Sequence, residues 1–76
     1  MTKKQIETLK NKAKLAVRNY AHDTNKMMEE IKRINSFIQE SYEMYLINEY
    51  SEVIKLQKEI GLAAMEELDK LQKEIA

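Results

Sequence analysis

The C-terminal third of the chain, residues 52–76, reads EVIKLQKEIGLAAMEELDKLQKEIA. Its apolar seam residues are spaced 3-4-4-4-3-4, which is the period of an α-helix with one apolar face. Most of the remaining residues are Lys, Glu, Gln, Leu and Ala, which favour helix. The stretch therefore predicts an amphipathic helix, ending at about residue 75, whose seam packs against other helices.

The composition of the whole chain also indicates helix. Its 76 residues contain one Gly and no Pro, whereas a small β-sheet protein needs several turns rich in such residues. There is no Cys, so disulfides and thiolate sites are excluded. We predict a single all-α domain over residues 1–76, built of two or three amphipathic helices as a helical hairpin or a three-helix bundle.

The N-terminal part predicts one helix from about residue 2 to residue 21. One stripe of this helix holds six apolar residues: Ile6, Leu9, Ala13, Ala16, Val17 and Tyr20. The segment 22–25 that follows reads HDTN and contains three residues that cap helices. We expect a boundary there, with Asp23 or Thr24 capping the second helix.

The second predicted helix is long, from about residue 25 to residue 60. Its apolar phase continues without Gly or Pro, but at 1.5 Å per residue an unbroken helix would extend roughly 54 Å, too long for a compact 76-residue globule. A break near 47–51, where Asn48 and Ser51 could cap a helix, is the alternative. The seam of the second and third segments forms either the core or an oligomer contact, and consists of Ile31, Ile34, Ile38, Tyr42, Val53, Leu56, Ile60, Leu68, Leu71 and Ile75. Because so short a chain has a thin core, we expect a homodimer with coiled-coil-like packing.

Charge is segregated along the chain although it sums to zero. Residues 1–38 hold nine Lys and Arg against four Asp and Glu, and residues 39–76 hold four against nine. We expect the basic first helix to pack antiparallel on the acidic last helix, in the same chain or in a partner chain. The basic face of the first helix consists of Lys3, Lys10, Lys14 and Arg18. Nucleic-acid binding by this face is the alternative, although two Arg and no interleaved aromatic residues support it only weakly.

A second apolar face predicts a partner-binding site. Ile47, Tyr50 and Ile54 follow one another at i, i+3 and i+7, and Glu43 and Glu49 stand beside them. Tyr is enriched at binding hot spots because it combines a large apolar area with a polar tip. If the helix bends near this point, the same residues would instead belong to the core.

Catalytic and membrane roles lack support in the sequence. His22 is the single histidine, and one Gly cannot form a phosphate-binding loop. We therefore predict a protein that is not an enzyme and has no metal site or cofactor. The longest apolar runs hold about six residues, far below the roughly 20 of a membrane span, so we expect a soluble, cytoplasmic protein without membrane contact.

The predicted function is protein–protein interaction. A small, self-associating helical module would act as a regulator, adaptor or inhibitor that binds a macromolecular partner stoichiometrically. One alternative is a nucleic-acid-associated regulator that uses the basic first helix. Another is a phage-type inhibitor whose acidic half mimics nucleic acid.

Overall fold

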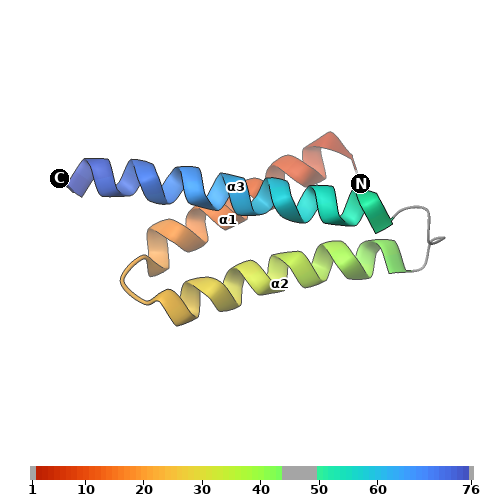
Figure 1. Cartoon of the computed structure of the whole chain (residues 1–76), viewed down its shortest axis with the longest axis horizontal. Coiled ribbons are helices and arrows are strands. Elements are labelled where there is room, and N and C mark those ends of the chain that lie inside the picture. The colour runs from red at the N-terminus through yellow and green to blue at the C-terminus, as the bar shows by residue number, and fades with distance from the viewer. Residues whose placement is uncertain (1, 44–49, 76) are drawn as a thin grey trace.

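The computed structural model describes residues 2–43 and 50–75 of the chain, and these residues form three helices. They are α1 (Lys3–Tyr20), α2 (Thr24–Glu43) and α3 (Tyr50–Ile75), as Figure 1 shows. All three elements in the described ranges are α-helices, so the predicted all-α class is confirmed. Of the two predicted arrangements, a helical hairpin and a three-helix bundle, the described residues form the second.

Local hydrogen bonds fix where α1 and α2 begin. Thr2 Oγ1 accepts a bond from the Gln5 backbone N–H at 3.1 Å, and Gln5 Oε1 accepts one from the Thr2 N–H at 2.9 Å. This reciprocal pair is a capping box, which satisfies two backbone donors that α1 leaves open. At the start of α2, Asp23 Oδ1 accepts a bond from the Lys26 N–H at 3.2 Å, as expected of a capping residue in the 22–25 boundary.

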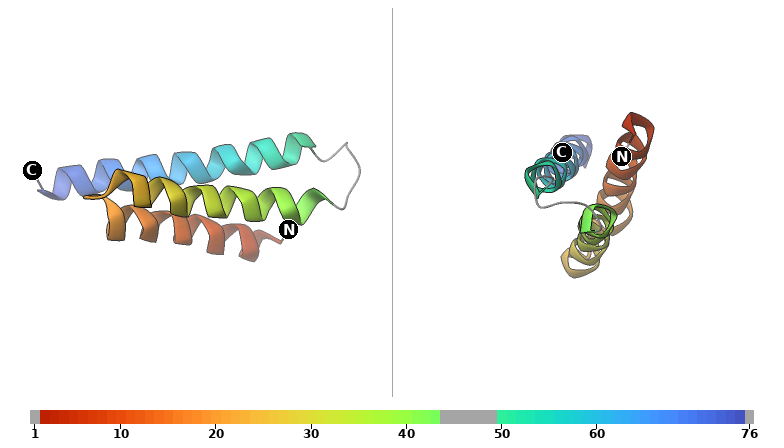
Figure 2. Two further views of the ribbon diagram at one scale, coloured as in Figure 1. Left: turned by 90° about the horizontal axis from the view of Figure 1, so that it is seen from below. Right: turned by 90° about the vertical axis from the view of Figure 1, so that its right-hand side faces the viewer.

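The helices α2 and α3 are separate and run in opposite directions (Figure 2), so an unbroken helix over residues 25–60 is not formed. Of the predicted break near 47–51, residues 47–49 lie outside the described residues, and Tyr50 and Ser51 begin α3. Folding α3 back lets one chain cover its own apolar seam.

The helices α1 and α3 lie parallel, which corrects the expected antiparallel packing of the basic first helix on the acidic last one. The direction of the chain reverses between α1 and α2 and again between α2 and α3. Two reversals restore the original direction, so the connectivity sets the orientation, and the ion pairs between α1 and α3 form within it. The resulting bundle measures 46 × 22 × 17 Å.

The core lies between the three helices and mixes small and branched residues. Val17, Ile38 and Ile60 are its largest fully buried side chains, one from each helix. Ala13 and Ala16 of α1 are buried as well, and their small side chains allow the neighbouring helices to approach closely. The buried cluster consists of Leu9, Ala13, Val17, Ile34, Ile38, Val53, Leu56, Ile60 and Ala64.

Candidate functional site

A groove runs along the outer side of the α1–α2 pair. It consists of two adjoining hollows of about 440 and 310 Å³, which share Leu9, Lys12 and Phe37. Their described lining comes from α1, α2 and the Thr2 cap. The larger hollow is lined by Leu9, Lys12, Leu15, Ala16, Asn19, Tyr20, Glu30, Arg33, Ile34 and Phe37. The smaller one extends the groove toward the start of α1, to Thr2, Lys4, Gln5 and Thr8.

The groove exists because α3 covers only one side of the α1–α2 pair. Leu9, Ala16 and Ile34 are turned toward the core, and their buried side chains form an apolar floor. Leu15 and Phe37 are displaced from the core stripes and remain 58% and 53% exposed beside this floor. Two large apolar side chains on a concave surface are typical of a site that a partner covers.

The rim of the groove is more basic than acidic. Of the described residues, Lys4, Lys12 and Arg33 line it, together with one acidic residue, Glu30. Arg33 Nη1 lies 3.0 Å from Glu30 Oε1, so these two charges largely offset each other. Lys4 and Lys12 form no ion pair with any described residue. Among the described residues, the groove therefore presents two positive charges without an ion-pair partner beside an apolar floor.

The predicted partner-binding residues fall only partly within the described chain. Tyr50 and Ile54, at the start of α3, are 65% and 50% exposed. Ile47, Glu49 and the side chain of Glu43 lie outside the described residues. The exposed pair stays a predicted contact on α3, apart from the groove between α1 and α2.

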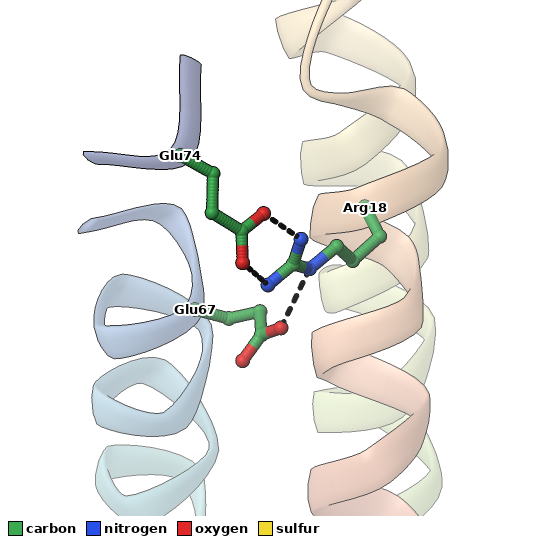
Figure 3. A network of polar contacts seen from close by, with 3 residues as sticks. All are labelled: Arg18, Glu67 and Glu74. Atoms are coloured by element: carbon green, nitrogen blue, oxygen red, sulfur yellow. Dashed lines mark hydrogen bonds and ion pairs between the residues drawn. The ribbon is translucent and has the colours of Figure 1, made fainter. Parts of the chain in front are cut away.

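The predicted basic face is partly used inside the molecule. Arg18 stands between two carboxylates of α3 (Figure 3). Its Nε donates to Glu67 Oε1 at 2.7 Å, its Nη2 donates to Glu74 Oε1 at 3.1 Å, and its Nη1 donates to the second Glu74 oxygen. These hydrogen bonds lower the pKa of Glu74 and raise the pKa of Arg18. The cluster joins α1 to α3 as a charge-assisted, two-pronged contact.

The other three members of the basic face are less engaged. Lys10 Nζ lies 3.8 Å from Glu59 Oε2 of α3. Lys3 and Lys14 form no ion pair with any described residue. The face therefore offers two unpaired lysines to a ligand.

The predicted seam lies mainly in the interior of the single chain. Five of its residues are buried in the core: Ile34, Ile38, Val53, Leu56 and Ile60. Four more are partly buried against it: Ile31, Tyr42, Leu68 and Leu71. Ile75, in the last turn of α3, is 77% exposed. A second chain is therefore not required to bury this seam.

Reasoning from the sequence did not identify the groove. Leu15 and Phe37 lie off the main apolar stripes of their helices, and that displacement was the available signal. It could not show that the two residues share one surface, because this depends on how α1 and α2 pack.

The described residues form neither a metal cluster nor a membrane span. Within 2–43 and 50–75, no three His, Cys, Asp or Glu side chains gather where they could hold a metal ion. None of the described helices combines the length and the apolar character needed to cross a membrane. Comparisons of the chain with models of known protein families, with curated proteins and with solved structures found no match.

Proposed function

We propose that this chain is a non-enzymatic interaction module that binds a protein partner stoichiometrically through the groove between α1 and α2. The observation that carries the proposal is the exposure of Leu15 and Phe37 beside an apolar floor. A regulator, adaptor or inhibitor of this kind acts by staying bound to its partner.

An amphipathic helix of the partner is the occupant that fits best. Two antiparallel helices form a groove into which a further helix can lay its apolar face, with anchors at i, i+3, i+4 and i+7. The groove follows α1 from Thr2 to Tyr20, and the 18 residues of α1 extend about 27 Å at 1.5 Å per residue. Since Lys4 and Lys12 on its rim form no ion pair with a described residue, acidic flanks on the partner helix would be favoured.

The expected strength of binding depends mainly on burial of the exposed side chains of Leu15 and Phe37. Complete burial of a Leu or Phe side chain contributes about 1.5–3 kcal/mol, and both are already about half covered. Together they should contribute roughly 1.5–3 kcal/mol, or about 12–140-fold in Kd. The lysines contribute less, because exposed ion pairs give about 0–1 kcal/mol each.

A pair of designed peptides tests this proposal. Both form amphipathic helices of about 18 residues with the same Leu and Ile anchors, and their flanks carry Glu in one and Lys in the other. Binding is followed by amide chemical shifts of the isotope-labelled protein. We expect the Glu-flanked peptide to shift residues of α1 and α2 around the groove and to bind more tightly than the Lys-flanked peptide.

Matched variants locate the contact. The double substitution Leu15→Ser and Phe37→Ser should weaken binding by at least about tenfold, whereas Leu62→Ser, an equally exposed apolar position on α3, should not affect it. Shifts confined to α3, or equal binding of both peptides, would contradict the proposal.

Nucleic-acid binding by the basic face is less well supported. Arg18 and Lys10 already face carboxylates of α3, which leaves Lys3 and Lys14 for phosphates. Two phosphate contacts on B-DNA correspond to a slope of about −1.8 in log Kobs against log salt. A steeper salt dependence in a binding assay with duplex DNA would favour that alternative instead.

A further inference from the structure

The outer face of α3 is exposed over its middle turns. Leu62 and Met65 are 54% and 68% exposed there. At 100° per residue, they fall on the side of α3 roughly opposite Val53, Leu56 and Ile60, which α3 buries in the core. This face is therefore separate from the groove between α1 and α2.

Charged residues stand at equal distances along the sequence before and after Leu62. Those before it are basic and those after it are acidic. Lys58 and Glu66 stand four residues before and after it, and Lys55 and Asp69 stand seven residues before and after it. At 100° per residue, offsets of four and seven return to the same face of a helix. All four charged residues are exposed. This self-complementary charged face consists of Lys55, Lys58, Leu62, Glu66 and Asp69.

These charges are largely unused inside the chain. Lys55, Lys58 and Glu66 form no ion pair with any described residue. Asp69 contacts Lys73 of the same helix at 3.1 Å, where both side chains are mostly exposed. Exposed pairs within a helix are weak and exchange readily for another partner.

A two-fold axis near Leu62 converts this pattern into attraction between two copies. In an antiparallel pair of α3 helices, a residue four positions after Leu62 stands opposite the residue four positions before it. Lys58 of one copy then faces Glu66 of the other, and Lys55 faces Asp69, and the axis repeats both pairs. A parallel pair in register would place like charges together and is disfavoured.

We propose that a second copy of the chain binds along the self-complementary charged face of α3, antiparallel, about a two-fold axis near Leu62. Leu62 and Met65 of both copies are covered at the centre, and the charged residues set orientation and register. The apolar centre is small, so the dimer is weak and depends on concentration. This contact does not rest on the proposed partner groove, which stays open in the dimer.

Charge exchange between two variants tests the proposal. Lys55→Glu with Lys58→Glu makes the face wholly acidic, and Glu66→Lys with Asp69→Lys makes it wholly basic. Masses are measured by sedimentation equilibrium at low salt, from micromolar to millimolar protein. We expect the wild-type chain to move from about 9 kDa toward twice that mass as its concentration rises. Each variant alone should dimerise on the order of tenfold more weakly or not at all, and an equimolar mixture should recover the dimer.

Two further variants complete the design. Leu62→Ser should weaken the dimer, and Leu15→Ser, which alters the groove, should leave it unchanged. A wild-type chain that stays near 9 kDa at all concentrations would overturn the proposal. So would a mixture that does not dimerise, or a dimer lost in Leu15→Ser and kept in Leu62→Ser. All substituted side chains are exposed, and circular dichroism checks that each variant is folded. Peptide binding in the groove should persist in the charge variants, so failure of the dimer is distinguishable from failure of the proposed function.

Discussion

Gly61 lies within α3, and apart from its chain neighbours and the nearby backbone of this helix, no atom stands within 4 Å of the position that a Cβ would take. Its backbone is helical without a positive φ, so the special freedom of Gly is not used there. Gly costs about 0.8–1 kcal/mol relative to Ala in a helix interior. We expect Gly61→Ala to raise stability by about that amount and the Tm by roughly 4–8 °C in thermal unfolding followed by circular dichroism. A lower Tm would show that α3 needs Gly at this position.

Ile60, one residue earlier, has the opposite environment, with 1% of its surface exposed. Ile60→Ala removes buried volume where all three helices meet and should cost about 2–5 kcal/mol. The free energy of unfolding of a domain of this size is only a few kcal/mol. The variant should therefore be largely unfolded at urea concentrations at which the wild type is still folded. Ile54→Ala is the matched control, because Ile54 is 50% exposed on the same helix and should change stability by about 1 kcal/mol or less. Equal losses in the two variants would contradict this assignment of the core.

At the scale of helices, Arg18 and its two carboxylates hold α1 against α3. Arg18 is in the last turn of α1, where a cation is favourable for the helix dipole. Glu74 is in the last turn of α3, where an anion is unfavourable, and Arg18 compensates for it by donating two hydrogen bonds. This contact therefore matters most while Glu74 is ionised.

The lowered pKa of Glu74 makes this contact depend on pH. The unfolded chain takes up this proton near the ordinary value of 4.5, and the folded chain takes it up only at lower pH. The stabilisation is thus present above about pH 4.5 and is lost as the pH falls through the lowered pKa. We expect Glu74→Gln to lower the urea midpoint at about pH 6 and to have a smaller effect at about pH 3. A difference between variant and wild type that is the same at both pH values would contradict the role of the charge.

The helices themselves were the predictable part of this structure. Apolar spacing and the HDTN segment anticipate where α1 ends and α2 begins to within about a residue, because caps and periodicity are local properties. The Thr2–Gln5 capping box also had a local signature, although it was not recognised. The parallel orientation of α1 and α3 was missed because charge segregation is satisfied by either direction. The groove was missed because it depends on the packing of two helices, which no single stripe encodes.

At the scale of the whole molecule, three helices give an elongated bundle with a radius of gyration of 13.2 Å for its Cα atoms. A compact chain of 76 residues would have about 11 Å. We expect small-angle X-ray scattering at low concentration to give a value near that of the bundle. A much larger value at the lowest concentration would contradict the folded-back arrangement of α3. A rise with increasing concentration would accompany dimer formation.

The parallel arrangement of α1 and α3 also determines how the bundle responds to force. The start of α1 and the end of α3 lie toward opposite ends of the long axis (Figure 1), so Thr2 and Ile75 are far apart. Tension applied between these two residues pulls the neighbouring helices α1 and α3 past each other along their length. Such shear loads the whole helix–helix contact at once, including the link from Arg18 to Glu67 and Glu74, whereas antiparallel helices pulled from the same end would peel apart one turn at a time. Under this loading the bundle should extend in one abrupt step.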